Sequence, residues 1–364
     1  MRNLVKLLVD SIIFFEAFFV ISEKHPGEKR ILIFRKDGLG DCLIFYPTIH
    51  SYREFYREAK ITLIFPNIFK SLASILTEVD EVIWFDHNLF RTSFFYRRNF
   101  ILSLKKRGYD VVLYPVYSKE KIAERMIKST KSPKIITFDN VSTQETSELN
   151  RYLDFTEYVT GVRPEIRFPS ISVDTLPYKN FDLVKPYVVI FPGTSVAKYR
   201  RWPSDRFAKI IEIIIGHDLI PIICGSVGEK ELAEEITSEI SPNLREKIVD
   251  LSGQTDFADL AHILKKAEFY FGSDTGALHL AVAVGTPTIA IVGVGGLNRF
   301  FPYGNLSLNR AVFDERTLQD PLLGTWTDTD KLPPNVPHPS IENISIVQVS
   351  KEIDYMVKFV NKNN

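Results

Sequence analysis

The chain of 364 residues carries 45 basic and 45 acidic side chains, and 45% of its residues are apolar. This length and apolar content are more than one hydrophobic core usually needs, so we expect two globular domains. An excess of five basic residues in residues 1–180 is balanced by an equal acidic excess in the remainder. This asymmetry is too small for a nucleic-acid-binding surface and allows an anionic partner only on the first half.

The two cysteines, Cys42 and Cys224, lie far apart in the sequence, and each is flanked by apolar residues. This spacing excludes a disulfide framework and a metal site of the CxxC type. We expect both to be small buried hydrophobes in a protein of a reducing compartment, which predicts a cytoplasmic location.

Residues 1–22 are apolar, but charged residues interrupt them and no small-residue cleavage pattern follows, so neither a signal peptide nor a membrane span is predicted. At 100° per residue, one narrow stripe holds the charged side chains Arg2, Lys6, Asp10 and Glu16. The pattern predicts an amphipathic helix in residues 1–22, which together with a basic lead-in makes up an N-terminal segment, residues 1–30. Its apolar face fits either a membrane interface, with peripheral contact through residues 1–22, or the protein's own surface.

After Arg30 the chain alternates short β-branched or aromatic runs with helical patterns, which is typical of βαβ units and a parallel sheet. Strands are expected at residues 31–35, 61–65, 82–85, 111–114 and 134–138, and helices at residues 43–56, 93–106 and 119–128. Residues 31–180 are predicted to form a first Rossmann-like domain. A proline-rich stretch, residues 163–186, is predicted to be a linker.

A second alternating series predicts another Rossmann-like domain over residues 181–340. Its strands are expected at residues 187–191, 220–224, 248–251, 269–271 and 288–292, and its helices at residues 204–215, 229–240, 257–265 and 278–284. Residues 301–339 show no periodic pattern. A last helix at about residues 346–360 occupies the C-terminal segment 341–364.

Gly38-Leu-Gly-Asp41 follows the first predicted strand and opens a helix. Parallel α/β folds bind ligands at this position, and glycines let the backbone approach a ligand closely. The spacing is not that of the GxGxxG dinucleotide motif. Asp41 has two interpretations: a first-turn carboxylate favoured by the helix dipole, or a general base that faces a cleft and takes a proton from a hydroxyl.

The second motif, residues 191–203, again joins a predicted strand to a helix. Its Pro-Gly-Thr-Ser turn offers hydroxyl and N–H groups, and Lys198, Arg200 and Arg201 offer positive charge for a phosphate. The alternative is a solvated basic loop in which Trp202 anchors the core.

The third motif, Gly272-Ser-Asp-Thr-Gly-Ala-Leu-His279, places Asp274, Thr275 and Gly276 at the start of a predicted helix. A helix N-terminus favours a diphosphate, and His279 lies one turn further on the same side. His279 is equally well explained as a structural side chain near the helix start.

These three motifs, in this order between residues 31 and 303, resemble glycosyltransferase family 9, the ADP-heptose:lipopolysaccharide heptosyltransferases and their relatives. The resemblance implies a GT-B fold of two Rossmann-like domains facing each other across a cleft, with the N-terminal amphipathic helix as an addition. It implies that the first domain binds the acceptor and the second the nucleotide sugar. It also implies inversion at the anomeric carbon without a metal or another cofactor.

Carried over by residue, the resemblance implies that Asp41 is the general base and that Gly38 and Gly40 form the acceptor-side loop. Arg200 takes the place of a family lysine that contacts the donor phosphate, and Lys198 is a second candidate because the loop is one residue longer. The implied donor-binding residues are Thr194, Ser195, Lys198, Arg200, Glu229, Asp274, Thr275, Gly276 and His279.

We therefore expect transfer of a heptose or related sugar from an ADP-linked donor to a lipopolysaccharide core, O-antigen or capsule glycan. The acceptor is expected on a lipid at the inner face of the cytoplasmic membrane. A set of basic residues in the first domain could bind the anionic groups of this acceptor, or it could simply lie on solvated helix faces. These residues are Arg91, Arg97, Arg98, Lys105, Lys106, Arg107, Lys119, Lys121 and Arg125. A GT-B sugar-nucleotide epimerase and a non-catalytic sugar-nucleotide-binding subunit are the alternative functions.

Overall fold

The computed structural model describes residues 2–117, 120–145, 147–194, 201–293, 295–319 and 340–363, with side chains described from residue 11 to residue 362 of these ranges. The chain forms two compact units, each described here by itself. The first contains Met1–Gly38, Thr48–Gln144 and Arg151–Glu165, and the second contains Leu39–Pro47, Glu145–Asn150 and Ile166–Asn364. The sequence-based division at residue 180 stays a prediction.

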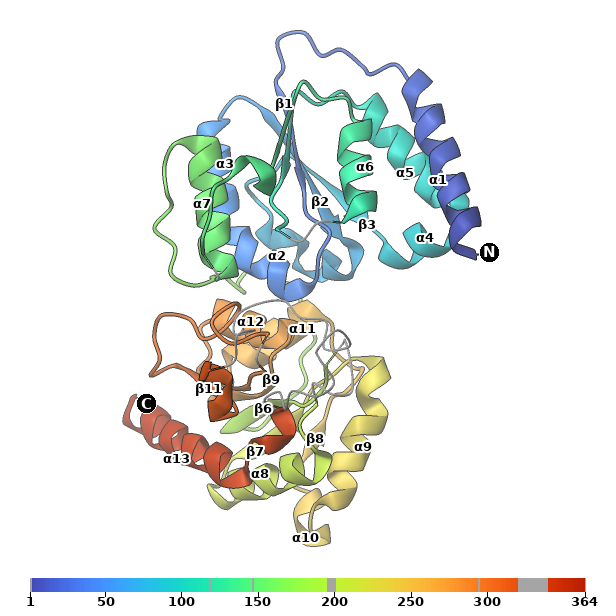
Figure 1. The fold of residues 1–364 in the computed structure, drawn as a ribbon. Coiled ribbons are helices and arrows are strands. Elements are labelled where there is room, and N and C mark those ends of the chain that lie inside the picture. Colours follow the sequence, from blue (N-terminus) through green and yellow to red (C-terminus); the bar gives the residue numbers. More distant parts are fainter. Residues whose placement is uncertain are drawn as a thin grey trace. The chain divides into compact units, whose positions relative to one another are not determined.

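The first unit is built on a parallel sheet in the order β3-β2-β1-β4-β5. Its strands are β1 (Arg30–Phe34), β2 (Lys60–Pro66), β3 (Glu81–Phe85), β4 (Val111–Tyr114) and β5 (Lys134–Thr137). Ile31 of the central strand lies opposite Ile61 of β2 and Val111 of β4. Strands β1 and β4 are buried along their whole length because helices cover both faces of the parallel sheet, as Figure 1 shows.

The helices of this unit are α1 (Arg2–Phe19), α3 (Ile49–Phe55), α4 (His87–Thr92), α5 (Phe94–Lys106), α6 (Lys121–Ser129) and most of α7 (Glu148–Thr160). On one face of the sheet, the core lies between the sheet and helices α5 and α6. The N-terminal helix α1 joins this core through Ile13 and Ala17, which are buried in it. The predicted amphipathic helix is therefore confirmed, and it packs on the protein. None of the helices in the described part of the chain is both long and apolar enough to span a membrane.

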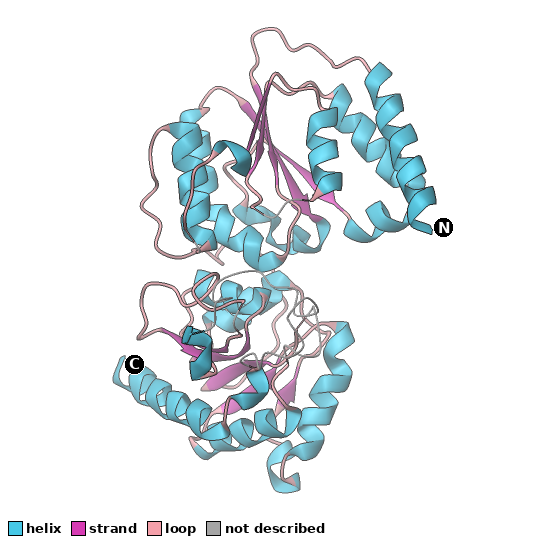
Figure 2. Cartoon of the chain, in the orientation of Figure 1, coloured by secondary structure: helices cyan, strands magenta, loops and turns pink. Residues whose placement is uncertain are grey.

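The second unit contains a six-stranded parallel sheet in the order β11-β10-β9-β6-β7-β8, drawn in magenta in Figure 2. Its strands are β6 (Tyr187–Phe191), β7 (Ile220–Ile223), β8 (Val249–Asp250), β9 (Phe269–Ser273), β10 (Thr288–Ile291) and β11 (Asn309–Val312). Numbered from its own first strand, this sheet follows the 3-2-1-4-5-6 order of doubly wound nucleotide-binding folds. The Rossmann-like prediction is confirmed.

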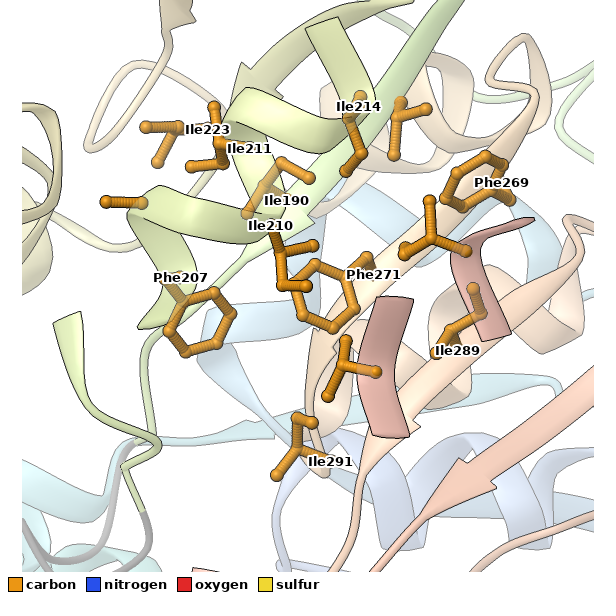
Figure 3. Packing of buried hydrophobic residues seen from close by; sticks show 14 of the residues in the cluster. Ile190, Phe207, Ile210, Ile211, Ile214, Ile223, Phe269, Phe271, Ile289 and Ile291 are labelled. Carbon is orange, nitrogen blue, oxygen red and sulfur yellow. The ribbon is translucent and has the colours of Figure 1, made fainter. Parts of the chain in front are cut away.

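The helices of the second unit are α2 (Leu39–Phe45), α8 (Ser204–Gly216), α9 (Lys230–Glu239), α10 (Pro242–Arg245), α11 (Phe257–Lys265), α12 (Gly276–Ala283) and α13 (Ile346–Asn363). The main core lies between the sheet and α8, α9 and α13 (Figure 3). In it Phe207 of α8 packs on Phe271 of β9 with ring centroids 5.4 Å apart. Both cysteines are buried, as predicted, and neither forms a disulfide with the other.

Three parts of the structure differ from the sequence-based expectations. The helix expected at residues 43–56 is broken into α2 and α3 by a 3-10 turn, Tyr46–Thr48, because Pro47 lacks an N–H and clashes with the preceding turn. Strand β11 lies in the segment 301–339 that shows no periodic pattern. Helices α4 and α7 were not expected either.

Candidate active site

The loops that follow β6 and β9 meet at the carboxyl edge of the second sheet. The strand order reverses between these two strands, and doubly wound sheets bind ligands at such a point. Residues 192–194 follow β6, and residues 274–276 follow β9. The Ser273 hydroxyl donates to the Pro192 carbonyl oxygen at 3.0 Å. Two of the three sequence motifs are therefore held side by side.

Helix α12 begins in the third motif with its N-terminal end at this edge. Thr275 is its N-cap residue, with an extended backbone (φ −143°) and no capping hydrogen bond from its side chain. The first N–H groups of a helix have no acceptor inside it and carry partial positive charge. A Cβ added to Gly276 would lie 2.7 Å from Cβ of Leu39, so only glycine fits the packing of α2 on this helix start. This end of α12 has the chemistry of an anion site.

His279 is buried one turn into α12 and lies between a tyrosine and a carboxylate. Its Nδ1 is 2.7 Å from the hydroxyl of Tyr303, and its Nε2 is 3.7 Å from an oxygen of Asp274. Burial lowers the pKa of His279 to about 4, so the ring is neutral at pH 7. If Tyr303 donates to Nδ1, the single ring proton resides on Nε2, the nitrogen that faces Asp274.

Helix α2 brings Asp41 to the same neighbourhood. A Cβ on Gly40 would overlap the His279 ring, so glycine permits the close approach of α2 to α12. Burial raises the pKa of the Tyr303 hydroxyl well above 10, and the negative charges of Asp274 and Asp41 raise it further. Asp41 is half-buried in the first turn of α2, whereas Gly38 is exposed. Asp41, Asp274 and His279 thus belong to one cluster around Tyr303.

A buried ion pair anchors the segment that carries Tyr303. The Nε of Arg299 donates to a Glu148 carboxylate oxygen at 2.9 Å, and the Glu148 N–H donates to the Arg299 carbonyl oxygen at 2.8 Å. Both side chains are almost fully buried. Removing one member of such a pair leaves an uncompensated buried charge. The first turn of α7 therefore contributes to the support of the cluster.

Glu229 lies against the turn that follows β6. Its carboxylate accepts hydrogen bonds from the Ser226 N–H at 2.7 Å and the Ser226 hydroxyl at 2.8 Å. The same carboxylate leaves no room for a Cβ on Gly193. Thr194 is buried where this turn continues. The predicted Ser195, Lys198 and Arg200 lie outside the described residues.

Another group of charged side chains lies at the carboxyl end of β1 in the first unit. The Nε of buried Arg35 is 3.2 Å from an Asp37 carboxylate oxygen, and this guanidinium also donates to the Tyr152 hydroxyl at 2.5 Å. Lys36 forms an ion pair with Glu120. The strand order of this sheet reverses between β1 and β4, so the group lies at the ligand-binding position of its own unit.

The basic residues suggested for acceptor binding lie mainly on α4, α5 and α6. Several of them form hydrogen bonds or ion pairs with other groups of the first unit. Arg97 is buried and donates to the Phe90 carbonyl oxygen at 3.0 Å, and Lys105 donates to the Ser22 hydroxyl at 2.8 Å. Arg98 forms an ion pair with Glu16. Lys119 lies outside the described residues. A role for this set in acceptor binding stays a prediction.

Sequence reasoning missed Tyr303, Glu148 and Arg299. Tyr303 falls in the segment without a periodic pattern and so gives no local signal. Glu148 and Arg299 are separated by 150 residues, so their pairing gives no local signal either. The short aromatic run Phe301-Pro-Tyr303, soon after the last predicted strand, was the one local feature that could have pointed to Tyr303. Within the described ranges, no three or more His, Cys, Asp or Glu side chains group closely enough to hold a metal ion.

Comparison with known sequences shows that the second unit resembles a known family. Residues 174–319 match the model of glycosyltransferase family 9 (heptosyltransferase). The chain is 25% identical over 175 residues to the lipopolysaccharide core heptosyltransferase OpsX of Haemophilus influenzae, a match that covers 47% of this chain and 50% of OpsX. The matched segments span about a third to a half of the length of the first curated relatives. The predicted resemblance to this family is confirmed.

Solved structures extend the likeness in fold to both units. A glycosyl transferase family 9 protein from Veillonella parvula superposes with a TM-score of 0.68 at 16% identity, over 90% of this chain and 97% of that one. The Escherichia coli heptosyltransferase WaaC, solved with ADP, superposes with a TM-score of 0.67 at 17% identity, over 90% and 99%. The chain therefore has the predicted GT-B fold.

Proposed function

We propose that this chain, whose second unit matches glycosyltransferase family 9, is an inverting glycosyltransferase that takes a heptose or related sugar from an ADP-linked donor. The observation that carries the proposal is the cluster of Asp41, Asp274 and His279 at the N-terminal end of α12. The sequence and structure of the second unit support the donor class, since its relatives are named heptosyltransferases and WaaC was solved with ADP.

The donor diphosphate would bind at the start of α12, with the N–H groups of Thr275 and Gly276 and the nearby turn at Thr194. Negative charge grows on the leaving diphosphate as the bond to the sugar breaks. Fixed N–H dipoles directed at that charge lower the barrier, and the loss of one such donor typically costs about a hundredfold or more in rate. Arg200 or Lys198, both in the basic loop, would supply the cationic contact without a metal.

Asp41 would act as general base for the acceptor hydroxyl, a contribution of roughly a hundred- to ten-thousandfold. The acceptor oxygen then attacks the anomeric carbon from the face opposite the diphosphate, and the configuration inverts. We infer an acceptor of the lipopolysaccharide core, O-antigen or capsule class because OpsX is named for the lipopolysaccharide core. We further propose that the acceptor is lipid-linked and that transfer takes place at the inner face of the cytoplasmic membrane.

The decisive experiment compares two aspartates that both lie in the first turn of a helix. Asp41→Asn is expected to keep ADP binding but abolish transfer from an ADP-heptose donor. Asp205→Asn, in the first turn of α8, removes an equivalent charge from a helix start and should transfer at the normal rate. Near-normal transfer by Asp41→Asn would exclude Asp41 as the base and return it to the role of a helix-dipole partner.

The donor class is tested by thermal denaturation with ADP-, GDP- and UDP-sugars, because a ligand that binds the folded state raises the melting temperature. An ADP-sugar is expected to give the largest shift. Transfer assays with and without a chelator, and NMR of the product's anomeric configuration, test metal independence and inversion. Conversion of the sugar nucleotide to an isomer without any acceptor would instead identify an epimerase.

A further inference from the structure

One narrow face of α1 attaches this helix to the first unit. Ile13 and Ala17 are fully buried against α5 and α6. Glu16 pairs with Arg98, and beyond the helix the Glu23 N–H donates to the Lys106 carbonyl oxygen at 2.7 Å. These contacts show that α1 and α5 run in the same direction, side by side, as Figure 1 also shows. Ile13 and Ala17 therefore supply the apolar contacts that hold α1 on the first unit.

The opposite face of α1 is aromatic and exposed. Its apolar side chains keep three fifths or more of their surface in water: Ile12 (60%), Phe15 (68%), Phe18 (63%) and Phe19 (67%). The Phe15 and Phe19 rings touch edge to face, with centroids 5.1 Å apart. Exposed phenylalanines of this size on one helix face form a contiguous apolar patch, which in soluble proteins marks an interaction surface.

The start of α5 also carries an exposed aromatic side chain. Arg98 of α5 pairs with Glu16 of α1, so this end of α5 lies alongside α1. Phe95 is 73% exposed. We call Ile12, Phe15, Phe18, Phe19 and Phe95 the aromatic face.

Cationic side chains from α6 and the loop after it border the aromatic face. The Lys131 ammonium lies 3.7 Å from the centre of the Phe18 ring, and the Arg125 guanidinium lies 4.2 Å from the centre of the Phe14 ring. Lys128 is exposed between them in sequence. The acidic Glu16 at this border is neutralised by Arg98. A row of exposed phenylalanines bordered by lysine and arginine complements a surface that is apolar within and anionic outside.

We propose that the aromatic face and its cationic border dock on an anionic lipid bilayer. Amphipathic helices with Phe on one side and basic residues beside them insert their apolar face at the boundary between headgroups and acyl chains. Lys128, Lys131 and Arg125 then meet the anionic headgroups. The cationic border favours the anionic headgroup region of a bilayer over an uncharged apolar partner. Docking is independent of the proposed transferase activity, since no donor or acceptor takes part.

Co-sedimentation of the full chain with vesicles tests this proposal. Binding is expected to vesicles of equal parts phosphatidylglycerol and phosphatidylcholine, to weaken with salt, and to be much lower for phosphatidylcholine alone. The triple substitution Phe15→Ser, Phe18→Ser and Phe19→Ser should reduce binding roughly tenfold or more. Lys128→Glu with Lys131→Glu should abolish the preference for anionic vesicles.

The matched control replaces two phenylalanines that are exposed elsewhere, Phe55→Ser and Phe168→Ser, and should bind vesicles as the original chain does. The ADP-induced thermal shift of the triple variant should be unchanged, which shows that the fold and the donor site are intact. Equal sedimentation of the triple variant and the original chain overturns the proposal. So does a dimer in light scattering that the triple variant loses, because the aromatic face then belongs to a second copy.

Discussion

His279 is a buried side chain whose neutral form is favoured only in the folded chain. Burial lowers its pKa to about 4 from the ordinary 6.5, so between these values the unfolded chain binds a proton that the folded chain does not. Stability is therefore greatest above pH 6.5 and is lost as the pH falls toward 4. The difference corresponds to roughly 3 kcal/mol.

We expect urea unfolding to show this loss of free energy between pH 6.5 and pH 4.5, and His279→Gln to remove most of it. Carboxylates titrate mainly below this window: hydrogen bonds from Ser241 lower the pKa of Glu212 to about 2, so its contribution is lost below its ordinary value of 4.5. An identical pH dependence in the original chain and in His279→Gln would show that His279 is not held neutral.

Tyr303 is expected to position His279 for the donor. Tyr303→Phe removes the hydroxyl at 2.7 Å from Nδ1 and leaves a buried nitrogen without this partner, at a cost of about 1–3 kcal/mol in the free energy of unfolding. Tyr187→Phe is the control, because its buried hydroxyl donates to the Ile263 carbonyl oxygen at 2.8 Å. Both variants should lose stability, but only Tyr303→Phe should weaken ADP binding. Equal ADP affinity in the two variants would reduce Tyr303 to a structural role.

At the scale of elements, the sheet was largely predictable and the cluster was only partly so. Strands such as β4 and β6 were predicted at their observed bounds because a strand covered on both faces is an uninterrupted apolar run. β11, Asn309–Val312, is a short edge strand with polar residues in it and gives no such signal. Helix α7 does carry buried residues at helical spacing, Leu149, Tyr152, Leu153 and Thr156, but polar residues between them obscured the period.

The three motifs could be identified from sequence because each has glycine, hydroxyl or charged side chains in a short run just before a predicted helix. Such a run is a local signal for a ligand-binding loop. Their meeting depends on strand order, which places β6 next to β9 although about 80 residues separate them in sequence. The approach of α2 to α12 depends on still more distant contacts. No pattern in the sequence around Gly40 specifies His279 as its neighbour.

The packing of α2 on α12 is tested by a single methyl group. Gly40→Ala adds a Cβ that overlaps the His279 ring, which is buried and held by Tyr303, so the helices must separate. We expect a loss of about 1–3 kcal/mol in the free energy of unfolding. Gly216→Ala, at the end of α8, is the control, because no heavy atom lies within 4 Å of its added Cβ. It should be neutral or stabilising by up to about 1 kcal/mol, and the same result for Gly40→Ala would contradict this contact.

At the scale of the whole molecule, the second unit is completed by two segments from the first half of the sequence, Leu39–Pro47 and Glu145–Asn150. The first supplies α2, whose residues Leu43, Ile44 and Phe45 are buried. The second supplies Glu148, the partner of buried Arg299. A domain cut from the sequence at residue 166 therefore lacks part of its own packing and one member of an ion pair.

We expect the fragment 166–364 to be less stable than the same unit in the full chain by at least about 2 kcal/mol, the cost of deleting one large buried side chain. The fluorescence of buried Trp202 can report the unfolding of this unit. For this measurement, Trp84 and Trp326 are replaced by Phe in the full chain, and Trp326 alone is replaced by Phe in the fragment. Attaching residues 38–47 through a flexible linker should recover part of the loss, because α2 can then return to α12. Equal unfolding midpoints for the fragment and the full chain would mean that the two added segments do not stabilise this unit.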